Sequence, residues 1–131
     1  MILQLDLSST IPFYVQIRNQ IVLWISSGEL PAGEGLPTVR QLAEDLGVNT
    51  MTVSKAYTLL KTEGFLEGDR RQGVRVKQLG LTPEFCRKLE DELSLLIAES
   101  KVRGMSKETF VSRCGQLFDA SSFSAMQKSI G

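Results

Sequence analysis

The chain has 131 residues, and 42% of them are apolar, which is enough for one packed domain with an appendage. Fifteen basic and fifteen acidic residues give zero net charge, which weakens any case for the whole chain as a polyanion binder. A nucleic-acid function would therefore depend on where the charges lie.

The residues needed for several kinds of chemistry are missing. Histidine is absent, and Cys86 and Cys114 lie far apart without a CxxC spacing. This argues against a transition-metal site and excludes His-based acid–base catalysis. Lone cysteines fit a reduced protein, and no leader pattern or apolar run near the ~18 residues of a membrane span is present. We therefore expect a cytoplasmic protein with no metal, no cofactor and no membrane contact.

The first predicted helix covers residues 12–27. Pro12 suits a first helical turn, apolar residues from Phe13 to Ile25 recur at three- and four-residue spacing, and Gly28 is a stop signal. The next ten residues, GELPAGEGLP, hold three glycines and two prolines, so they are predicted to form a loop.

Two short helices joined by a tight turn follow. The capping box Thr38-Val39-Arg40-Gln41 predicts a helix that ends at Gly47, and Asn49 is a good N-cap for the next one. Helices joined so closely must cross steeply, as in a helix-turn-helix unit. The apolar stripe of the third helix consists of Val53, Ala56, Tyr57 and Leu60.

A β-hairpin is predicted after Gly64. Phe65-Leu66 is expected as a short strand, residues 68–73 as a turn, and residues 74–76 as the return strand. The fold class is therefore mainly α: a winged helix-turn-helix of three helices and a two-stranded wing over residues 1–79. An all-helical segment is expected over residues 80–131, with a frayed tail from about residue 121.

The start of the third predicted helix is polar where a core helix would be apolar. Asn49, Thr50, Met51 and Thr52 stand where the second helix of a helix-turn-helix meets base edges in the major groove. Asn and Thr can bond to base edges, and methyl groups can touch thymine. Residues 49–77 also carry six basic and three acidic side chains, a local net charge of +3 suited to phosphate contact.

Structural roles could account for some of these features. Helix-turn-helix geometry also occurs in purely structural helix pairs. Arg70 and Arg71 could belong to an ordinary solvated turn, and Arg40 is spaced to pair with Glu44. Tyr57 suits the core better than a stacking platform.

The segment LPTVRQLAEDLGVNTMTVSKAYTLLKTEGFL resembles the DNA-binding signature of the GntR family of bacterial transcription regulators. The preceding PFYVQIRNQIVLWISSGELPAGEGLP is similar to the first helix and loop of that family, so the resemblance covers about residues 10–77. GVNTMTVSKAY and the short helical C-terminal part look most like the YtrA-type subgroup.

The resemblance implies roles for individual residues. Arg40 takes the place of an arginine that contacts the DNA backbone, Ser54 and Lys55 follow on the groove-facing side, and Gly73 matches the wing-tip glycine. The residues predicted to bind DNA are Thr38, Arg40, Asn49, Thr50, Met51, Thr52, Ser54, Lys55, Arg70, Arg71, Gln72 and Gly73.

The chain also departs from the family pattern. Many members have arginine at the positions of Thr50 and Ser54, so the family's preference for guanine is in doubt here. The usual wing sequence Gly-x-Gly-Thr-Phe-Val is replaced by residues 71–76, RQGVRV, so a differently shaped wing tip is expected.

The C-terminal block is predicted to contain two helices. Thr82-Pro83-Glu84 starts a helix that ends at Gly104, and Ser106 caps another. A small winged helix cannot cover both apolar faces, so a second copy is expected to cover them, although some surface could close onto the first helix. The residues predicted to form this dimer are Phe85, Leu89, Leu93, Leu96, Ile97, Phe110, Leu117 and Phe118.

The sequence thus predicts a sequence-specific transcription regulator, a homodimeric repressor that binds an inverted-repeat operator in double-stranded DNA. The alternative is a protein-interaction module that uses the winged helix as a scaffold. No enzyme activity is expected, because no nucleophile with a nearby base and no Gly-rich phosphate loop is present. The C-terminal block is too short for a dedicated effector domain, and a small-molecule effector at the dimer seam stays open.

Overall fold

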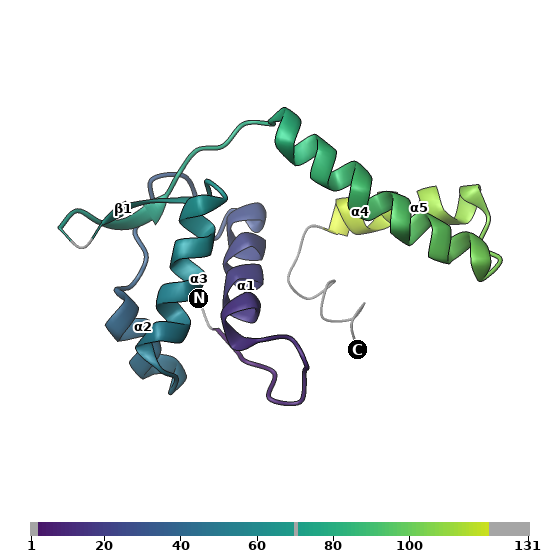
Figure 1. Cartoon of the computed structure of the whole chain (residues 1–131). Coiled ribbons are helices and arrows are strands. Elements are labelled where there is room, and N and C mark those ends of the chain that lie inside the picture. Colours follow the sequence, from purple (N-terminus) through teal and green to yellow (C-terminus); the bar gives the residue numbers. More distant parts are fainter. Residues whose placement is uncertain (1–2, 70, 121–131) are drawn as a thin grey trace. The chain divides into compact units, whose positions relative to one another are not determined.

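The computed structural model describes residues 3–69 and 71–120 (Figure 1). Its described part divides into two compact units, with the boundary between Leu79 and Gly80. In chain order the elements are α1 (Phe13–Ser27), α2 (Val39–Leu46), α3 (Thr50–Thr62), β1 (Leu66–Asp69), β2 (Gly73–Val76), α4 (Pro83–Val102) and α5 (Lys107–Ala120). The predicted fold class, three helices and a hairpin wing followed by helices, is confirmed.

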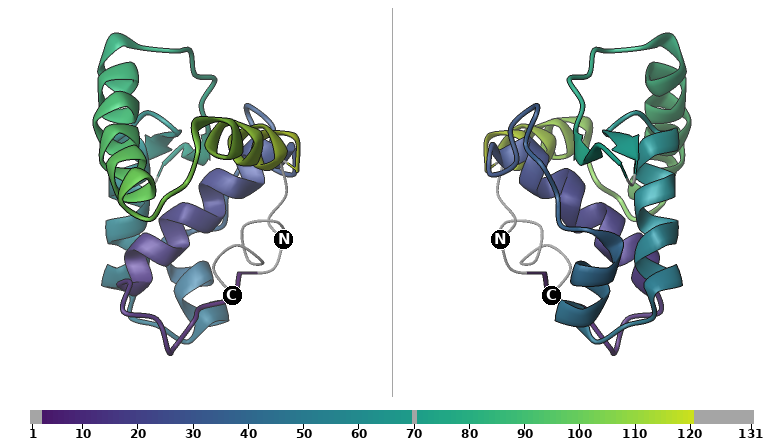
Figure 2. Two further views of the ribbon diagram at one scale, coloured as in Figure 1. Left: turned by 90° about the vertical axis from the view of Figure 1, so that its right-hand side faces the viewer. Right: turned by 90° about the vertical axis from the view of Figure 1, so that its left-hand side faces the viewer.

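The first unit is built around α3, which packs against both α1 and α2 (Figures 1 and 2). The predicted apolar stripe of α3 is buried, and it meets stripes from the other two helices and one residue from each strand. The buried apolar core is Ile17, Ile21, Trp24, Leu30, Leu42, Ala43, Val53, Ala56, Tyr57, Leu60, Leu66 and Val76. Burial of these side chains removes apolar surface from water and fixes the rotation of α3 about its axis.

The helix ends follow local sequence signals. α1 begins at Phe13, one residue later than predicted, because Pro12 is its N-cap residue. Gly28 ends α1 and Gly47 ends α2 in the left-handed conformation that favours glycine. The capping box of α2 is present in full, with Thr38 Oγ1 accepting from Gln41 N and Gln41 Oε1 accepting from Thr38 N, both at 3.1 Å.

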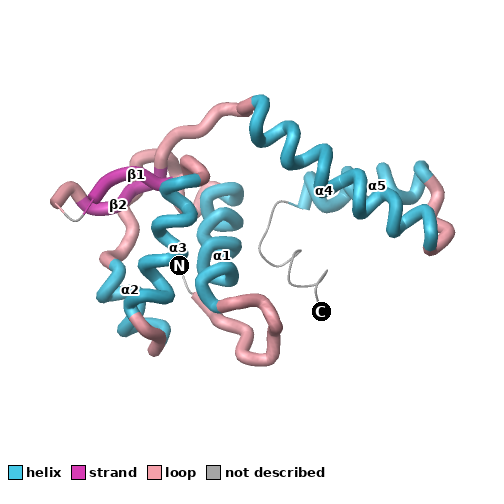
Figure 3. The backbone as a smooth tube through the Cα atoms, viewed as in Figure 1, coloured by secondary structure: helices cyan, strands magenta, loops and turns pink. Residues whose placement is uncertain are grey.

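The wing strands are longer than the sequence predicts (Figure 3). Gly68 and Gly73 were expected in a turn, but Gly68 pairs with Val74 and Asp69 pairs with Gly73 in the antiparallel ladder. The reason is the close approach of the strands at Gly68, where φ is 109° and an added Cβ would lie 2.0 Å from the Gly73 carbonyl oxygen. Only glycine fits that contact, so the ladder extends where composition alone indicates a turn.

The predicted loop before α2 also takes part in the wing. Its residues Gly33, Glu34 and Leu36 bond to β2: Gly33 N donates to Val76 O, Val76 N to Glu34 O, and Leu36 N to Val74 O, each at 2.8 Å. The loop thus runs beside β2 like a short third strand. This contact ties the wing to the segment that leads into α2.

A bidentate ion pair joins α1 to the end of α3. Arg18 Nε donates to Glu63 Oε1 and Arg18 Nη2 to Glu63 Oε2, both at 2.9 Å, and the guanidinium lies 5.6 Å from the centroid of the Phe65 ring. Both partners are only partly exposed, and the two-point geometry is the stronger form of such a pair. The contact holds the point at which the chain leaves α3 and enters the wing.

Among the described residues of the second unit, none is fully buried. Thr82 caps α4 by accepting from Phe85 N, and Ser106 caps α5 by accepting from Thr109 N, as predicted, but neither helix has a buried residue. Within the described residues, no helix is long and apolar enough to cross a membrane. The predicted frayed tail, residues 121–131, lies outside the described residues.

Candidate nucleic-acid interface

The exposed side of α3 is polar from its first residue. Thr50, Ser54 and Lys55 are exposed, Met51 is 66% exposed, and Thr52 is half-buried beside the core residue Val53. Because Val53, Ala56, Tyr57 and Leu60 fill the opposite side, these polar residues cannot turn inward without exposing the core. The helix therefore presents short polar and methyl-bearing side chains at the end where a recognition helix contacts bases.

Tyr57 connects the buried side of α3 to the start of α2. Its hydroxyl donates to the Pro37 carbonyl oxygen at 2.8 Å, directly before the N-cap residue Thr38. Burial raises the pKa of the Tyr57 phenol, so the hydroxyl keeps its proton and stays a donor. This bond places Thr38 and Arg40, two predicted DNA-binding residues, relative to α3. Tyr57 itself belongs to the buried core, as predicted, and is not a stacking platform.

Asn49 is fixed by its role as a cap. Its Oδ1 accepts from Met51 N at 2.8 Å, and its carbonyl oxygen accepts from Thr52 N at 3.0 Å. These two amides are therefore not available to a phosphate. Asn49 is exposed, and the nitrogen of its side-chain amide, Nδ2, remains a hydrogen-bond donor.

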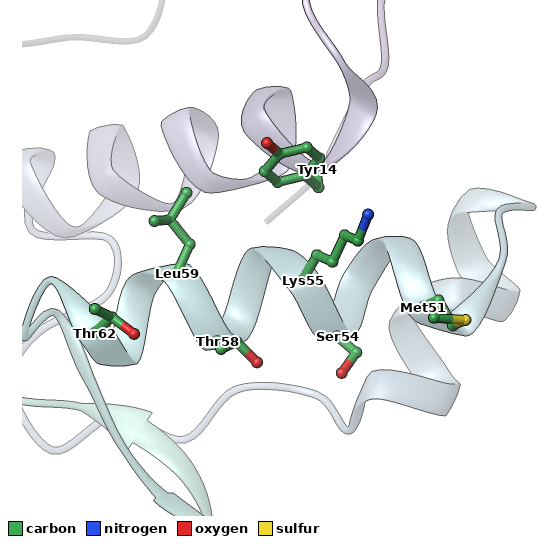
Figure 4. Close-up of a pocket in the computed structure, with 7 residues that line it drawn as sticks. All are labelled: Tyr14, Met51, Ser54, Lys55, Thr58, Leu59 and Thr62. Atoms are coloured by element: carbon green, nitrogen blue, oxygen red, sulfur yellow. The ribbon is translucent and has the colours of Figure 1, made fainter.

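Two open grooves run between α1 and α3, with volumes of about 430 and 470 Å³. They bring together the predicted residues Asn49, Met51, Thr52, Ser54 and Lys55. Figure 4 shows Met51, Ser54 and Lys55 in one of the two grooves. In Figure 4, Lys55 extends from α3 toward α1, whereas Ser54 and Thr58 point away from α1. The grooves are therefore part of the same surface as the polar start of α3.

The grooves also contain residues that the sequence prediction missed. Thr58 and Thr62 continue the exposed line of α3 at four-residue spacing from Ser54, and that spacing could have revealed them. Tyr14 belongs to α1 and carries no such signal, because only the packing of α1 on α3 brings it to Lys55.

The wing turn is organised by Asp69. Its Oδ1 accepts from the backbone amides of Arg71 and Gln72, both at 2.9 Å, and Arg71, Gln72 and Gly73 are exposed. Gly73, the first residue of β2, has a φ of 77°, in the left-handed region that favours glycine. Arg70, also predicted to bind DNA, lies outside the described residues. The Arg71 side chain thus extends from a segment in which the backbone amides of Arg71 and Gln72 already donate hydrogen bonds to Asp69.

Two further arginines differ in how much charge they offer. Arg75 Nε lies 3.2 Å from Glu67 Oε1 across the ladder, so part of the predicted positive charge of the wing is neutralised. Arg40 is exposed at the start of α2, and within the described residues it forms no salt bridge with Glu44. The helix-surface pair that its spacing allowed is not formed.

Residues 13–76 match the family model described as "Bacterial regulatory proteins, gntR family". The chain is 33% identical over 109 residues to the HTH-type transcriptional repressor YtrA of Bacillus subtilis, covering 81% of this chain and 84% of that protein. The chain belongs to the GntR family. It is a DNA-binding transcription regulator, not an enzyme, and its relatives support the predicted YtrA-type subgroup.

Solved structures agree with this assignment. YtrA from Sulfolobus acidocaldarius, a GntR-family transcription factor, is 37% identical with a TM-score of 0.65, over 78% of this chain and 99% of that one. The DNA-binding domain of AraR, solved in complex with operator ORX1, is 30% identical with a TM-score of 0.50, over 57% of this chain and 92% of that one. The described residues contain no cluster of three or more His, Cys, Asp or Glu side chains able to hold a metal ion.

The two roles of Asn49 can be separated by substitution. Asn49→Ala removes the cap and should lower the free energy of unfolding by about 1 kcal/mol. Asn49→Asp keeps the acceptor for Met51 N but replaces the side-chain amide donor with a negative charge on the predicted DNA-binding surface. We expect near-normal stability and an affinity for duplex DNA reduced by about tenfold, the size of one lost contact. Thermal unfolding and fluorescence-anisotropy titration measure the two effects, and unchanged affinity in Asn49→Asp would remove this residue from the interface.

Proposed function

We propose that the protein is a homodimeric, cytoplasmic repressor that binds an inverted-repeat operator through the start of α3 and the wing. The observation that carries this proposal is the two-sided character of α3. Its apolar side is buried in the core. Its exposed side carries Thr50, Met51, Ser54 and Lys55 near the N-terminal end, which is the end of a recognition helix that contacts bases.

The exposed residues divide by chemistry into two groups. Thr50, Met51 and Thr52 have short polar or methyl-bearing side chains, which suit direct contact with base edges. Lys55, Arg40 and Arg71 carry the charge that suits phosphates, which position the protein without specifying sequence. With threonine at position 50, sequence preference should depend on methyl and hydroxyl contacts and not on arginine bonds to guanine.

The proposed repression is supported by relatives. The Bacillus subtilis relative that aligns with 81% of this chain is named a transcriptional repressor. A protein that binds its operator without a catalytic step acts most simply by blocking access to the promoter. We propose that this chain also represses transcription by blocking access to the promoter.

The proposed homodimer is supported by the surface of α4 and α5. Leu89, Leu96, Leu117 and Phe118 are exposed in the single chain, Phe118 by 86%. Neither helix has a buried residue, so these apolar side chains would stay in contact with water in a single chain. In an isologous dimer, the same apolar surface of each copy packs against that of the other and is removed from water. The dimer also supplies two copies of α3, which is why the operator should be an inverted repeat. A small-molecule effector at the seam of this dimer stays an open alternative.

Base and phosphate contacts predict different effects of substitution. Thr50→Ala should change which duplexes bind best, with a change in binding free energy of about 1–3 kcal/mol for the affected base pair. Arg71→Ala should weaken binding to all duplexes equally, and the salt dependence of the binding constant should fall by the amount of about one phosphate contact. Titrations of a set of duplexes at several salt concentrations make the comparison.

Leu7→Glu is a matched control, because Leu7 is 81% exposed and lies outside the proposed interface. If Thr50→Ala and Arg71→Ala both behaved like Leu7→Glu, DNA would bind elsewhere, and the surface would better suit the protein-interaction alternative.

The dimer can be tested without DNA. Leu96→Glu or Leu117→Glu would place a carboxylate in the proposed apolar seam, where an unpaired charge costs several kcal/mol, so the dimer should dissociate. Sedimentation velocity should show a dimer for the wild-type chain and for Leu7→Glu, and a monomer for either seam variant. A wild-type chain that sediments as a monomer, or seam variants that stay dimeric, would contradict the proposed interface.

A further inference from the structure

The side chains of Lys55 and Tyr14 meet across the groove between α3 and α1. Lys55 Nζ lies 5.6 Å from the centroid of the Tyr14 ring, within the range of a cation–π contact. Tyr14 is the second residue of α1 and is half-buried, whereas Lys55 is exposed. Figure 4 shows the lysine side chain extended from α3 toward the ring.

The surroundings of the pair matter for its charge. Tyr14 and Lys55 both line the two grooves of the candidate interface, and none of the residues that line those grooves is acidic. A carboxylate partner would also hold the lysine in place, but it would cancel the charge that a phosphate needs, as Glu67 does in part for Arg75. The aromatic ring restrains the ammonium group and leaves its full positive charge available.

We propose that Tyr14 is a positioning residue for Lys55, holding its ammonium group ready to contact a DNA phosphate. This inference deepens the proposed function, since it requires that the Lys55 face binds DNA. A free lysine side chain loses rotamer freedom when it is immobilised at an interface, and that loss weakens binding. A lysine already restrained by a ring loses less, so Tyr14 strengthens binding without touching the DNA itself.

The size of the effect follows from the exposure of the pair. A cation–π contact at an exposed site is modest, so removal of the ring should weaken duplex binding by about two- to fivefold. The effect should depend on the ring and not on the hydroxyl, and it should vanish when Lys55 carries no charge. These two conditions separate positioning from a general structural role.

The test is a double-mutant cycle on the full chain. Tyr14→Phe keeps the ring, Tyr14→Leu removes it while retaining apolar bulk, and Lys55→Met removes the charge. Tyr14→Met is a second replacement in case the leucine variant does not fold. Each variant, and Tyr14→Leu combined with Lys55→Met, is titrated with one short duplex of fixed mixed sequence at several salt concentrations, with thermal unfolding measured in parallel.

We expect Tyr14→Phe to bind like the wild type and Tyr14→Leu to bind about two- to fivefold more weakly at similar thermal stability. In the Lys55→Met background, Tyr14→Leu should have no further effect. A proton NMR spectrum should show the Lys55 ε-methylene shifted by the ring current, and this shift should be lost in Tyr14→Leu.

Several results would overturn the inference. Equal binding by Tyr14→Leu and the wild type would do so, as would equal weakening by Tyr14→Phe and Tyr14→Leu, because the hydroxyl would then be responsible. A penalty that persists in Lys55→Met would show that Tyr14 acts by another route. If Lys55→Met weakens binding and Tyr14→Leu does not, only this inference fails. If Lys55→Met leaves both affinity and salt dependence unchanged, the assignment of this face to DNA fails as well.

Discussion

The structure of the first unit depends on the burial of one side of α3. Val53, Ala56, Tyr57 and Leu60 are at most 2% exposed, and each buried side chain of this size contributes on the order of 1.5–3 kcal/mol, somewhat less for alanine. A rotation of the helix by one residue would expose part of this stripe and bury Ser54 without a partner. The constraint that holds the core together is therefore the same one that keeps the polar side of α3 facing outward.

The other parts of the first unit are positioned relative to this helix. The Tyr57 hydroxyl holds the Pro37 carbonyl and so the start of α2, and the Arg18–Glu63 pair holds the end of α3 where the wing begins. Residues 33–36 bond to β2, so the segment before α2 and the wing support each other. The start of α2, the end of α3 and the wing are therefore held relative to one another before any partner binds, and in the proposed account this lowers the entropic cost of binding DNA.

Local signals in the sequence predicted much of this unit, and tertiary contacts account for what was missed. The capping box at Thr38, the Asn49 cap and the glycine stops each depend on residues within a few positions, so they can be recognised without a structure. The strand-like pairing of residues 33–36, the extension of β1 through Gly68 and the approach of Tyr14 to Lys55 depend on partners distant in sequence. The DNA contacts of individual residues and the dimer are still predictions, because both concern surfaces that a single chain leaves exposed.

The two units have complementary roles in the proposed account. The first supplies one recognition helix, and α4 and α5 supply the apolar surface that pairs two copies. The measurement that tests this account most directly is selection of bound sequences by the full-length chain from a pool of random duplexes. The account predicts enrichment of an inverted repeat whose half-sites lie about 10 base pairs apart or a multiple of that spacing. No enrichment, or enrichment of a single site without two-fold symmetry, would contradict it.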